Sequence, residues 1–177
     1  CLLEQFNILG KVDLLTGTFS KSFGAVGGFV VGSQKMIQYL RYYANTTVFS
    51  AAIVPQVTCS VLKALSIMQT RPDIREKLWR NTNYLKERLI AEGYEIGDTA
   101  SPIIPVKIRN DHKAKEVTRL LFQHGIYVIG IVYPAVSMKD ARIRLAVTAS
   151  HEIDQLDQLI DHLAIINQQI PIKIKYK

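Results

Sequence analysis

The stretch Thr16-Gly17-Thr18-Phe19-Ser20-Lys21-Ser22-Phe23-Gly24-Ala25-Val26-Gly27-Gly28 organises the rest of this chain. It places one lysine, Lys21, among four small hydroxyl residues and follows it with three glycines. The apolar runs 12–15 before it and 29–31 after it predict two short buried strands. Lys21 is therefore expected on the connection between two strands, in a small, polar and tightly turned setting.

The side chains around Lys21 suit one kind of chemistry. A lysine amine forms a Schiff base with a carbonyl cofactor when its surroundings make it nucleophilic. Thr18 and Ser20 can offer hydroxyl groups to a phosphate, and the glycines let the backbone approach a flat ligand. From composition alone, a solvated lysine in a Ser/Gly turn remains the simpler interpretation, because such turns are common.

Three segments resemble one known family. Residues 18–24, followed by Gly27-Gly28, resemble the pyridoxal-phosphate attachment motif of the α-oxoamine synthases, fold-type-I enzymes that join an amino acid to an acyl-CoA. Phe49-Ser50-Ala51-Ala52-Ile53-Val54-Pro55 is similar to a second segment of that family. Ala141-Arg142-Ile143-Arg144 with Thr148-Ala149-Ser150-His151 is similar to a third, and all three stand in the family's order.

The resemblance implies an α/β fold, the C-terminal part of a fold-type-I PLP-dependent transferase. Residues 1–70 would end the sheet of the large PLP-binding domain, and residues 71–177 would form a small α+β domain. Complete members of the family are about twice as long, so the aspartate and the stacking ring that hold the cofactor are expected upstream. The 177-residue chain alone is expected to be inactive.

The resemblance also assigns roles to individual residues. Lys21 would carry pyridoxal 5'-phosphate (PLP) as an internal aldimine and act as general base, with Thr18 and Ser20 beside the cofactor. Ser50 would reach the cofactor phosphate of a partner subunit, which implies a homodimer. The alternative for Ser50 is a helix cap before Pro55.

Arg144 would bind the carboxylate of the amino-acid substrate, since a guanidinium fork makes two parallel bonds to a carboxylate. Arg142 and Arg144 face the same side of a strand, so spacing does not separate them, and the choice of Arg144 rests on the resemblance. An arginine pair on an exposed sheet face is the alternative. Tyr133 is a candidate for lining the acyl channel. His151 is similar to a motif histidine of the family, and we expect a structural role for it.

Among family members, bacterial serine palmitoyltransferases look closest, which implies a decarboxylating condensation of an amino acid with an acyl-CoA. Glycine C-acetyltransferase, 8-amino-7-oxononanoate synthase, a PLP aminotransferase and a non-catalytic dimerising fragment remain open. The formal net charge of +7 fits a coenzyme A substrate and fits a solvated basic tail equally well.

Composition excludes several classes. With 48% hydrophobic residues and no apolar run near the ~20 residues of a membrane span, the chain reads as a globular cytoplasmic protein without an integral membrane segment. Two cysteines, Cys1 and Cys59, are too few and too unpatterned for a disulfide framework or a zinc site. The tyrosines near residue 40 have only Lys35 and Arg41 close by, which argues against nucleic-acid binding.

Periodicity predicts the remaining elements. We expect a polar loop at 45–50, a left-handed helix cap at Gly93, an edge strand at 102–108 and a final helix capped by Ser150. That last helix would bury Ile153, Leu156, Leu159, Ile160 and Leu163. The other expected elements are helices at 36–43, 55–70, 72–92 and 110–125, and strands at 126–132 and 141–147.

Overall fold

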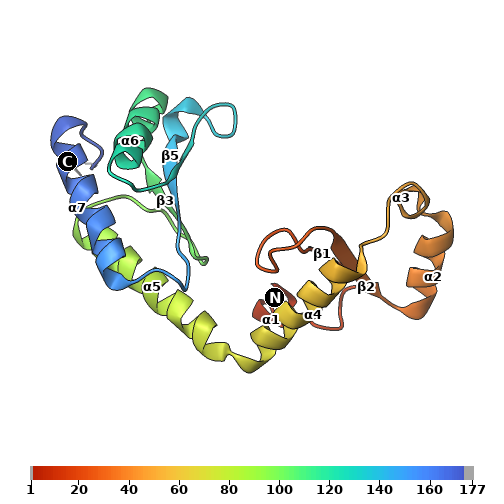
Figure 1. Ribbon diagram of the computed structural model, residues 1–177. Coiled ribbons are helices and arrows are strands. Elements are labelled where there is room, and N and C mark those ends of the chain that lie inside the picture. The colour runs from red at the N-terminus through yellow and green to blue at the C-terminus, as the bar shows by residue number, and fades with distance from the viewer. Residues whose placement is uncertain (1, 174–177) are drawn as a thin grey trace. The chain divides into compact units, whose positions relative to one another are not determined.

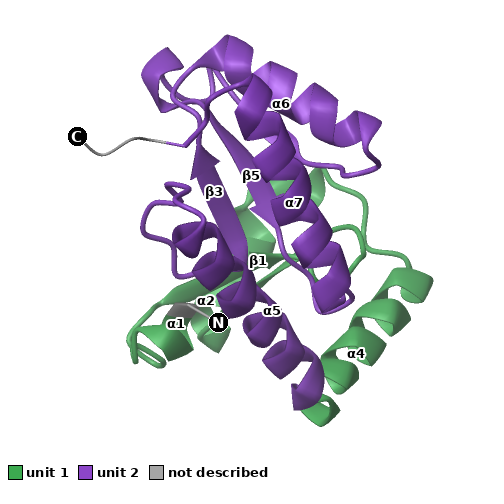
Figure 2. Cartoon of the chain, turned by 90° about the vertical axis from the view of Figure 1, so that its left-hand side faces the viewer, with its two compact units in different colours: residues 1–71 green, residues 72–177 purple. Residues whose placement is uncertain are grey.

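The computed structural model describes residues 2–173 (Figure 1). The chain divides into two compact units, Cys1–Arg71 and Pro72–Lys177, which Figure 2 shows in different colours. Across residues 2–173, none of the helices combines the length and the apolar character needed to cross a bilayer.

The first unit is a two-stranded antiparallel ribbon with helices around it. Strand β1 (Leu14–Thr18) pairs with β2 (Gly28–Gly32) from Leu14↔Gly32 to Thr18↔Gly28. Helix α2 (Gln34–Tyr43) follows β2, and the Ser33 hydroxyl caps it by accepting the Met36 N–H at 3.3 Å. The other helices are α1 (Leu2–Gln5), α3 (Asn45–Val48) and α4 (Pro55–Thr70).

Both expected strands exist, but the expectation that they are buried is wrong for this unit. Val30 is 47% exposed and Val31 is 55% exposed, and no residue from 3 to 71 is buried. A continuous apolar run indicates a strand whose two faces are both covered. Within this unit only two strands pair and α2 contacts β2, so most of the ribbon's apolar surface has no cover.

Residues 45–50 also depart from the expectation of a loop. Asn45–Val48 forms a short helix, closed by the Phe49 N–H donating to the Asn45 carbonyl at 3.0 Å. Ser50 does not cap the next helix either. Val54 precedes α4, and Pro55 stands in its first turn, where the missing N–H of proline costs nothing.

The second unit is an α+β layer in the order helix, strand, helix, strand, strand, helix. Its antiparallel sheet has the strand order β3-β5-β4, so β3 lies at an edge, as its prolines predict. The expected strand at 126–132 is shorter, because only three residues pair with β5. The elements are α5 (Pro72–Ala91), β3 (Ile103–Lys107), α6 (Asp111–Gln123), β4 (Ile129–Ile131), the 3-10 turn η1 (Met138–Asp140), β5 (Arg142–Ala146) and α7 (Ile153–Gln169).

The sheet of this unit buries one face. Ile104 pairs with Leu145 and Val106 with Ile143, and all four side chains are buried in the core. Helices α5, α6 and α7 contribute the rest of that core, and Figure 2 shows α6 and α7 alongside β3 and β5. Because strand side chains alternate, Arg142 and Arg144 fall on the opposite face.

Helix ends follow capping chemistry, with one correction. Asn110 caps α6 by accepting the Lys113 N–H at 2.9 Å, and Gly93 has a φ of +80°, both as expected. The cap of α7 is Glu152 and not Ser150, because Glu152 and Gln155 form a reciprocal capping box that Ser150 cannot make. Ile153 is 41% exposed, against expectation, whereas the other four expected core residues of α7 are buried.

Candidate functional site

Lys21 lies on the loop that connects β1 to β2, as the sequence predicts, and its side chain is exposed. The loop is closed at its base by the Phe19 N–H donating to the Gly27 carbonyl and the Ala25 N–H donating to the Phe19 carbonyl, both at 2.9 Å. At its tip the Gly24 N–H donates to the Lys21 carbonyl at 2.9 Å. Three backbone hydrogen bonds thus hold Lys21 in a defined turn.

Aromatic rings support this loop from within. The Phe19 ring centre lies 5.4 Å from those of Phe23 and Phe29. A Cβ atom on Gly17 would come within 2.4 Å of the Phe29 ring, so only glycine allows this packing. Gly24 has a φ of +60°, which a glycine adopts without strain. Gly17 and Gly24 are therefore required by the structure of the loop, apart from any role in ligand binding.

Two hydroxyl groups lie side by side next to the lysine. Thr18 Oγ1 is 2.8 Å from Ser20 Oγ, and the Ser20 N–H donates to Thr18 Oγ1 at 3.1 Å. Both residues are exposed, and across residues 2–173 no ion pair involves Lys21. An unpaired amine beside paired hydroxyls suits a ligand that carries both a carbonyl and an anionic group. This donor set fits PLP.

Ser50 forms its hydrogen bond with the backbone and not with Thr18 or Ser20. Its hydroxyl donates to the Thr46 carbonyl at 2.5 Å, across the turn that follows α3, and the side chain is exposed. The bond occupies the Ser50 proton and leaves the oxygen lone pairs available. Ser50 can therefore accept a hydrogen bond as it stands, and it must rotate to donate one to a phosphate.

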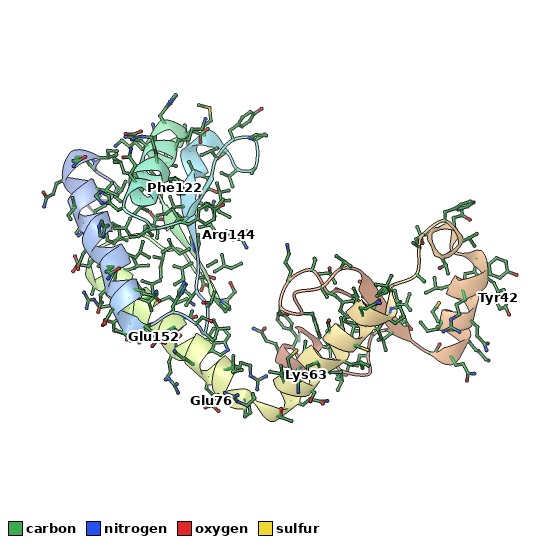
Figure 3. The ribbon with its side chains drawn as sticks, viewed as in Figure 1. Tyr42, Lys63, Glu76, Phe122, Arg144 and Glu152 are labelled. Atoms are coloured by element: carbon green, nitrogen blue, oxygen red, sulfur yellow. The ribbon has the colours of Figure 1, made fainter. Side chains whose placement is uncertain are left out.

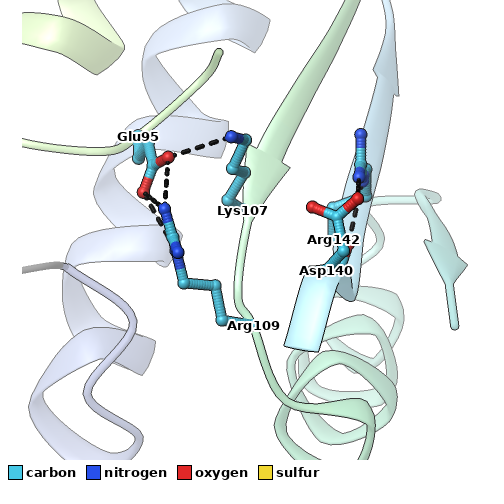
Figure 4. A network of polar contacts seen from close by, with 5 residues as sticks. All are labelled: Glu95, Lys107, Arg109, Asp140 and Arg142. Carbon is cyan, nitrogen blue, oxygen red and sulfur yellow. Dashed lines mark hydrogen bonds and ion pairs between the residues drawn. The ribbon is translucent and has the colours of Figure 1, made fainter. Parts of the chain in front are cut away.

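The structure distinguishes the two arginines that the sequence left together. Arg142 is held by Asp140, whose carbonyl accepts from Arg142 Nε at 2.9 Å and whose carboxylate pairs with the guanidinium (Figure 4). Arg144 is exposed and forms no ion pair within residues 2–173. Its neighbours across the sheet are the apolar residues Pro105 and Ile129. Of these two arginines, Arg144 is the one whose guanidinium has no ion pair within residues 2–173.

Arg144, labelled in Figure 3, also lines a cleft of about 550 Å³ within the second unit. The floor of the cleft is apolar and includes Leu85, Leu156 and Leu159. Three polar side chains line the cleft together with Arg144. They are His151, from the segment that leads into α7, and Gln155 and Gln158, from α7 itself. The cleft combines the guanidinium of Arg144 with an apolar floor, which suits a carboxylate that carries an apolar group.

Asn81 on α5 organises the segment before α7, and sequence reasoning missed it. Its side chain is 3% exposed, and Nδ2 donates to the carbonyls of Thr148 and His151 at 3.1 and 2.8 Å. The His151 ring in turn accepts the Thr148 N–H through Nδ1 at 3.2 Å. No spacing rule links residue 81 to residues 148–151, and the signal in the sequence is an asparagine that stands three residues after Leu78 and four before Leu85, on the apolar side of a predicted helix.

Tyr133 is 66% exposed on the loop between β4 and η1 and does not line this cleft. Its N–H donates to the Asp111 carboxylate at 3.3 Å, at the start of α6. No hydrogen bond or shared cleft joins Tyr133 to Arg144 in the part of the chain that the structure describes. Residues 2–173 contain no cluster of three or more histidine, cysteine, aspartate or glutamate side chains that could hold an ion.

The electrostatic network of the second unit centres on Glu95. Its carboxylate accepts from Arg109 at 2.7 Å and pairs with Lys107 at 3.0 Å (Figure 4). The hydrogen bond from Arg109, helped by Lys107, lowers the pKa of Glu95. Burial raises the pKa of Tyr94 to about 12. These groups belong to the structural framework and not to the Lys21 loop or the Arg144 cleft.

Comparison with known proteins places the chain in a family. Residues 4–163 match the family model described as aminotransferase class I and II. The chain belongs to this family. The family match includes the Lys21 loop, Ser50 and Arg144, so the candidate residues lie inside the shared region.

Similar proteins indicate which members of the class I and II aminotransferase family the chain resembles. It is 42% identical over 170 residues to a serine palmitoyltransferase of Sphingobacterium spiritivorum, covering 96% of this chain and 43% of the relative. It is 36% identical over 169 residues to an 8-amino-7-oxononanoate synthase of Thermoanaerobacter pseudethanolicus, covering 96% and 43%. These relatives confirm the resemblance to the α-oxoamine synthases, and the chain spans less than half of their length.

Solved structures agree with the family assignment. The serine palmitoyltransferase of Sphingomonas wittichii matches with a TM-score of 0.90 at 27% identity, covering 98% of this chain and 44% of that one. A structure of serine palmitoyltransferase (SPT) with PLP as an internal aldimine matches with a TM-score of 0.90 at 26% identity, covering 97% of this chain and 44% of that one. The expected fold-type-I architecture is thereby confirmed for this member of the family.

Proposed function

We propose that the chain is part of a PLP-dependent acyltransferase that condenses an amino acid with an acyl-CoA and releases carbon dioxide and coenzyme A. The observation that carries the proposal is the 42% identity to a serine palmitoyltransferase across 96% of the chain. The exposed Lys21 amine beside the Thr18 and Ser20 hydroxyls supports it independently. An 8-amino-7-oxononanoate synthase is the second candidate, favoured by the 36% identity to such an enzyme.

In this proposal the Lys21 loop holds the cofactor. Lys21 Nζ would hold PLP covalently, the Thr18 and Ser20 hydroxyls would bond polar groups of the cofactor, and Ser50 would reach the phosphate of the PLP bound to the partner subunit. PLP supplies an electron sink for negative charge at the substrate α-carbon. With the cofactor bound, the Lys21 amine would act as the general base that takes the α-proton of the amino acid. The three loop hydrogen bonds hold the backbone from which the Lys21 side chain extends.

Arg144 takes the substrate carboxylate in the same scheme. Among residues 2–173 no carboxylate pairs with its guanidinium, whereas the Arg142 guanidinium is held by Asp140. A bidentate bond to the carboxylate orients the amino acid and leaves its α-carbon free to react. Tyr133, exposed on its loop, is the candidate for contact with the acyl chain.

We also propose that the enzyme works as a homodimer, with residues 1–70 in the cofactor-binding domain and residues 71–177 in a smaller domain. The apolar side chains of the first unit support this, since Tyr42 is 81% exposed (Figure 3) and Phe49 is 86% exposed. Large apolar side chains exposed close together in the sequence, as at Tyr42 and Phe49, are typical of an interface. Phe49 precedes Ser50 directly, so a contact at Phe49 would bring Ser50 to the neighbouring subunit.

The decisive experiment starts from the complete enzyme purified with PLP. Borohydride reduction followed by peptide mapping should find the pyridoxyl group on Lys21, and Lys21→Ala should lose it. Coenzyme A release is then measured with serine and palmitoyl-CoA, and with glycine and acetyl-CoA. Release in neither pair, together with nitrogen transfer to a keto acid, would refute the acyltransferase and favour an aminotransferase. A pyridoxyl group on another lysine would refute the role of Lys21.

A further inference from the structure

Two histidines from different helices lie against each other in the second unit. His124 ends α6 and His162 lies on α7, and their ring centres are 4.6 Å apart with the ring planes inclined by 50°. Neither ring belongs to the Arg144 cleft. We propose that this pair, His124 and His162, binds a divalent first-row transition-metal ion such as Zn²⁺.

The separation of the rings suits chelation. A metal ion bound to one nitrogen of each imidazole, at about 2.0–2.1 Å, lies about 3 Å from each ring centre. Ring centres 4.6 Å apart can therefore share one ion. Imidazole is a ligand that Zn²⁺, Ni²⁺ and Cu²⁺ all accept. Water completes the coordination, because the pair supplies only two protein ligands.

A hydrogen bond sets the tautomer of the His162 ring. His162 Nδ1 lies 2.7 Å from the Gln158 carbonyl oxygen. A carbonyl oxygen only accepts, so Nδ1 carries the hydrogen and donates it. In the neutral ring this leaves the lone pair on Nε2 for a metal. Metal-binding histidines in proteins commonly make such a bond with the other nitrogen, because it sets the tautomer and the ring orientation.

The position of His124 favours a cation. His124 is the C-cap of α6, and its N–H donates to the carbonyls of Leu120 and Leu121 at 3.2 and 3.0 Å. The C-terminal end of a helix carries partial negative charge, which attracts a cation. Arg119, the basic side chain of the preceding turn, is paired with Glu116 at 2.6 Å, so its charge is compensated. The His124 side chain itself is exposed, so an ion can reach it from solvent.

A shared ion would tie the end of α6 to α7. Anything that binds the folded state and not the unfolded chain raises the free energy of unfolding in proportion to the logarithm of its concentration. The predicted consequence is a melting temperature that rises with Zn²⁺ concentration. The inference rests on these two helices alone and is independent of PLP and of the proposed reaction.

The test is calorimetric titration of ZnCl₂ into the full chain, made in a Cys1→Ser/Cys59→Ser background so that thiols do not contribute. One zinc site is expected, and His124→Ala and His162→Ala should each weaken it at least tenfold. His112→Ala is the matched control, because His112 also lies on α6 and is exposed but stands outside the pair. His162→Gln, checked by circular dichroism, serves if an alanine variant fails to fold.

Two further readouts decide the outcome. MgCl₂ should leave the melting temperature unchanged, because Mg²⁺ prefers oxygen ligands, whereas ZnCl₂ should raise it for the parent and for His112→Ala only. Zinc affinity that is unchanged in both His124 and His162 variants overturns the proposal. An equal loss in the His112 control overturns it as well, because the site would then lie elsewhere.

Discussion

Replacing Asn81 tests whether one buried side chain holds the segment beside the Arg144 cleft. Asn81→Ala removes the donors to the Thr148 and His151 carbonyls, at 3.1 and 2.8 Å. Each hydrogen bond contributes about 0.5–1.5 kcal/mol net, and a buried carbonyl left unpaired costs more. Because Thr148 is exposed, water can partly replace one partner. We expect the free energy of unfolding to fall by about 2 kcal/mol.

Urea denaturation of the full chain, followed by the fluorescence of Trp79, measures this change. Trp79 is the only tryptophan in the sequence and lies on α5 two residues before Asn81, so it reports on this helix. With a slope of about 1–3 kcal/mol per molar urea, the midpoint should fall by roughly 1 M. Asn83→Ala, an exposed asparagine on the same helix, should stay within about 0.5 kcal/mol of the parent.

Equal effects of the two substitutions would refute the reasoning, because the buried hydrogen bonds would then contribute no more than an exposed surface asparagine. Asn81→Asp gives a second check. It keeps the shape of the side chain but replaces the two donors with acceptors that face carbonyl oxygens, so it should destabilise the chain at least as much as alanine. A milder effect of aspartate would show that the donors of Asn81 are not what the segment needs.

Three other predictions address the site and the assembly. In the complete enzyme, Arg144→Ala should weaken amino-acid binding by one to two orders of magnitude and leave PLP binding intact, since a charge-assisted clamp contributes ~1.5–3 kcal/mol. Arg144→Lys should restore part of the loss. Equal amino-acid affinities of the parent and Arg144→Ala in a spectroscopic titration would count against the clamp. Glu95 has a folded-state pKa below its usual value, so its contribution to the free energy of unfolding is present above about pH 4.5 and is lost as the pH falls through the lower folded value. Glu95→Gln should therefore reduce the loss of stability at acid pH, measured as the free energy of unfolding against pH. Light scattering of the active enzyme should report a two-fold homodimer, and a fully active monomer would contradict the proposed role of Ser50.

Local sequence patterns predicted most of the elements, because the signals that start and end them lie within a few residues of each other. Asn110 at the start of α6 and Gly93 after α5 are of this kind. The error at α7 shows where such signals compete. Ser150 is a good capping residue by type, but Glu152 is followed three residues later by Gln155, and the reciprocal pair of bonds decides the boundary.

The burial of strands was less predictable than their existence. The run around Val30 and Val31 has the composition of a strand covered on both faces, yet in the first unit these side chains are 47% and 55% exposed. An apolar run records that a strand requires cover, but it does not say which segment supplies that cover. Burial depends on contacts between segments that are distant in the chain, and a pattern with a period of two contains no information about them.

By itself, the sequence determined the family, the lysine that stands out and the loop that carries it, since the loop is held by bonds among residues 17–29, all close in the chain. Only the tertiary structure showed that Arg142 and Arg144 differ in their ion pairing. The two are identical in type and face, and they differ because the 3-10 turn before β5 brings Asp140 against Arg142. The tertiary structure alone also revealed Asn81, because its partners lie 67 and 70 residues away. Hydrogen bonds between distant segments form only when the packed core brings those segments together, and no local pattern encodes that distance.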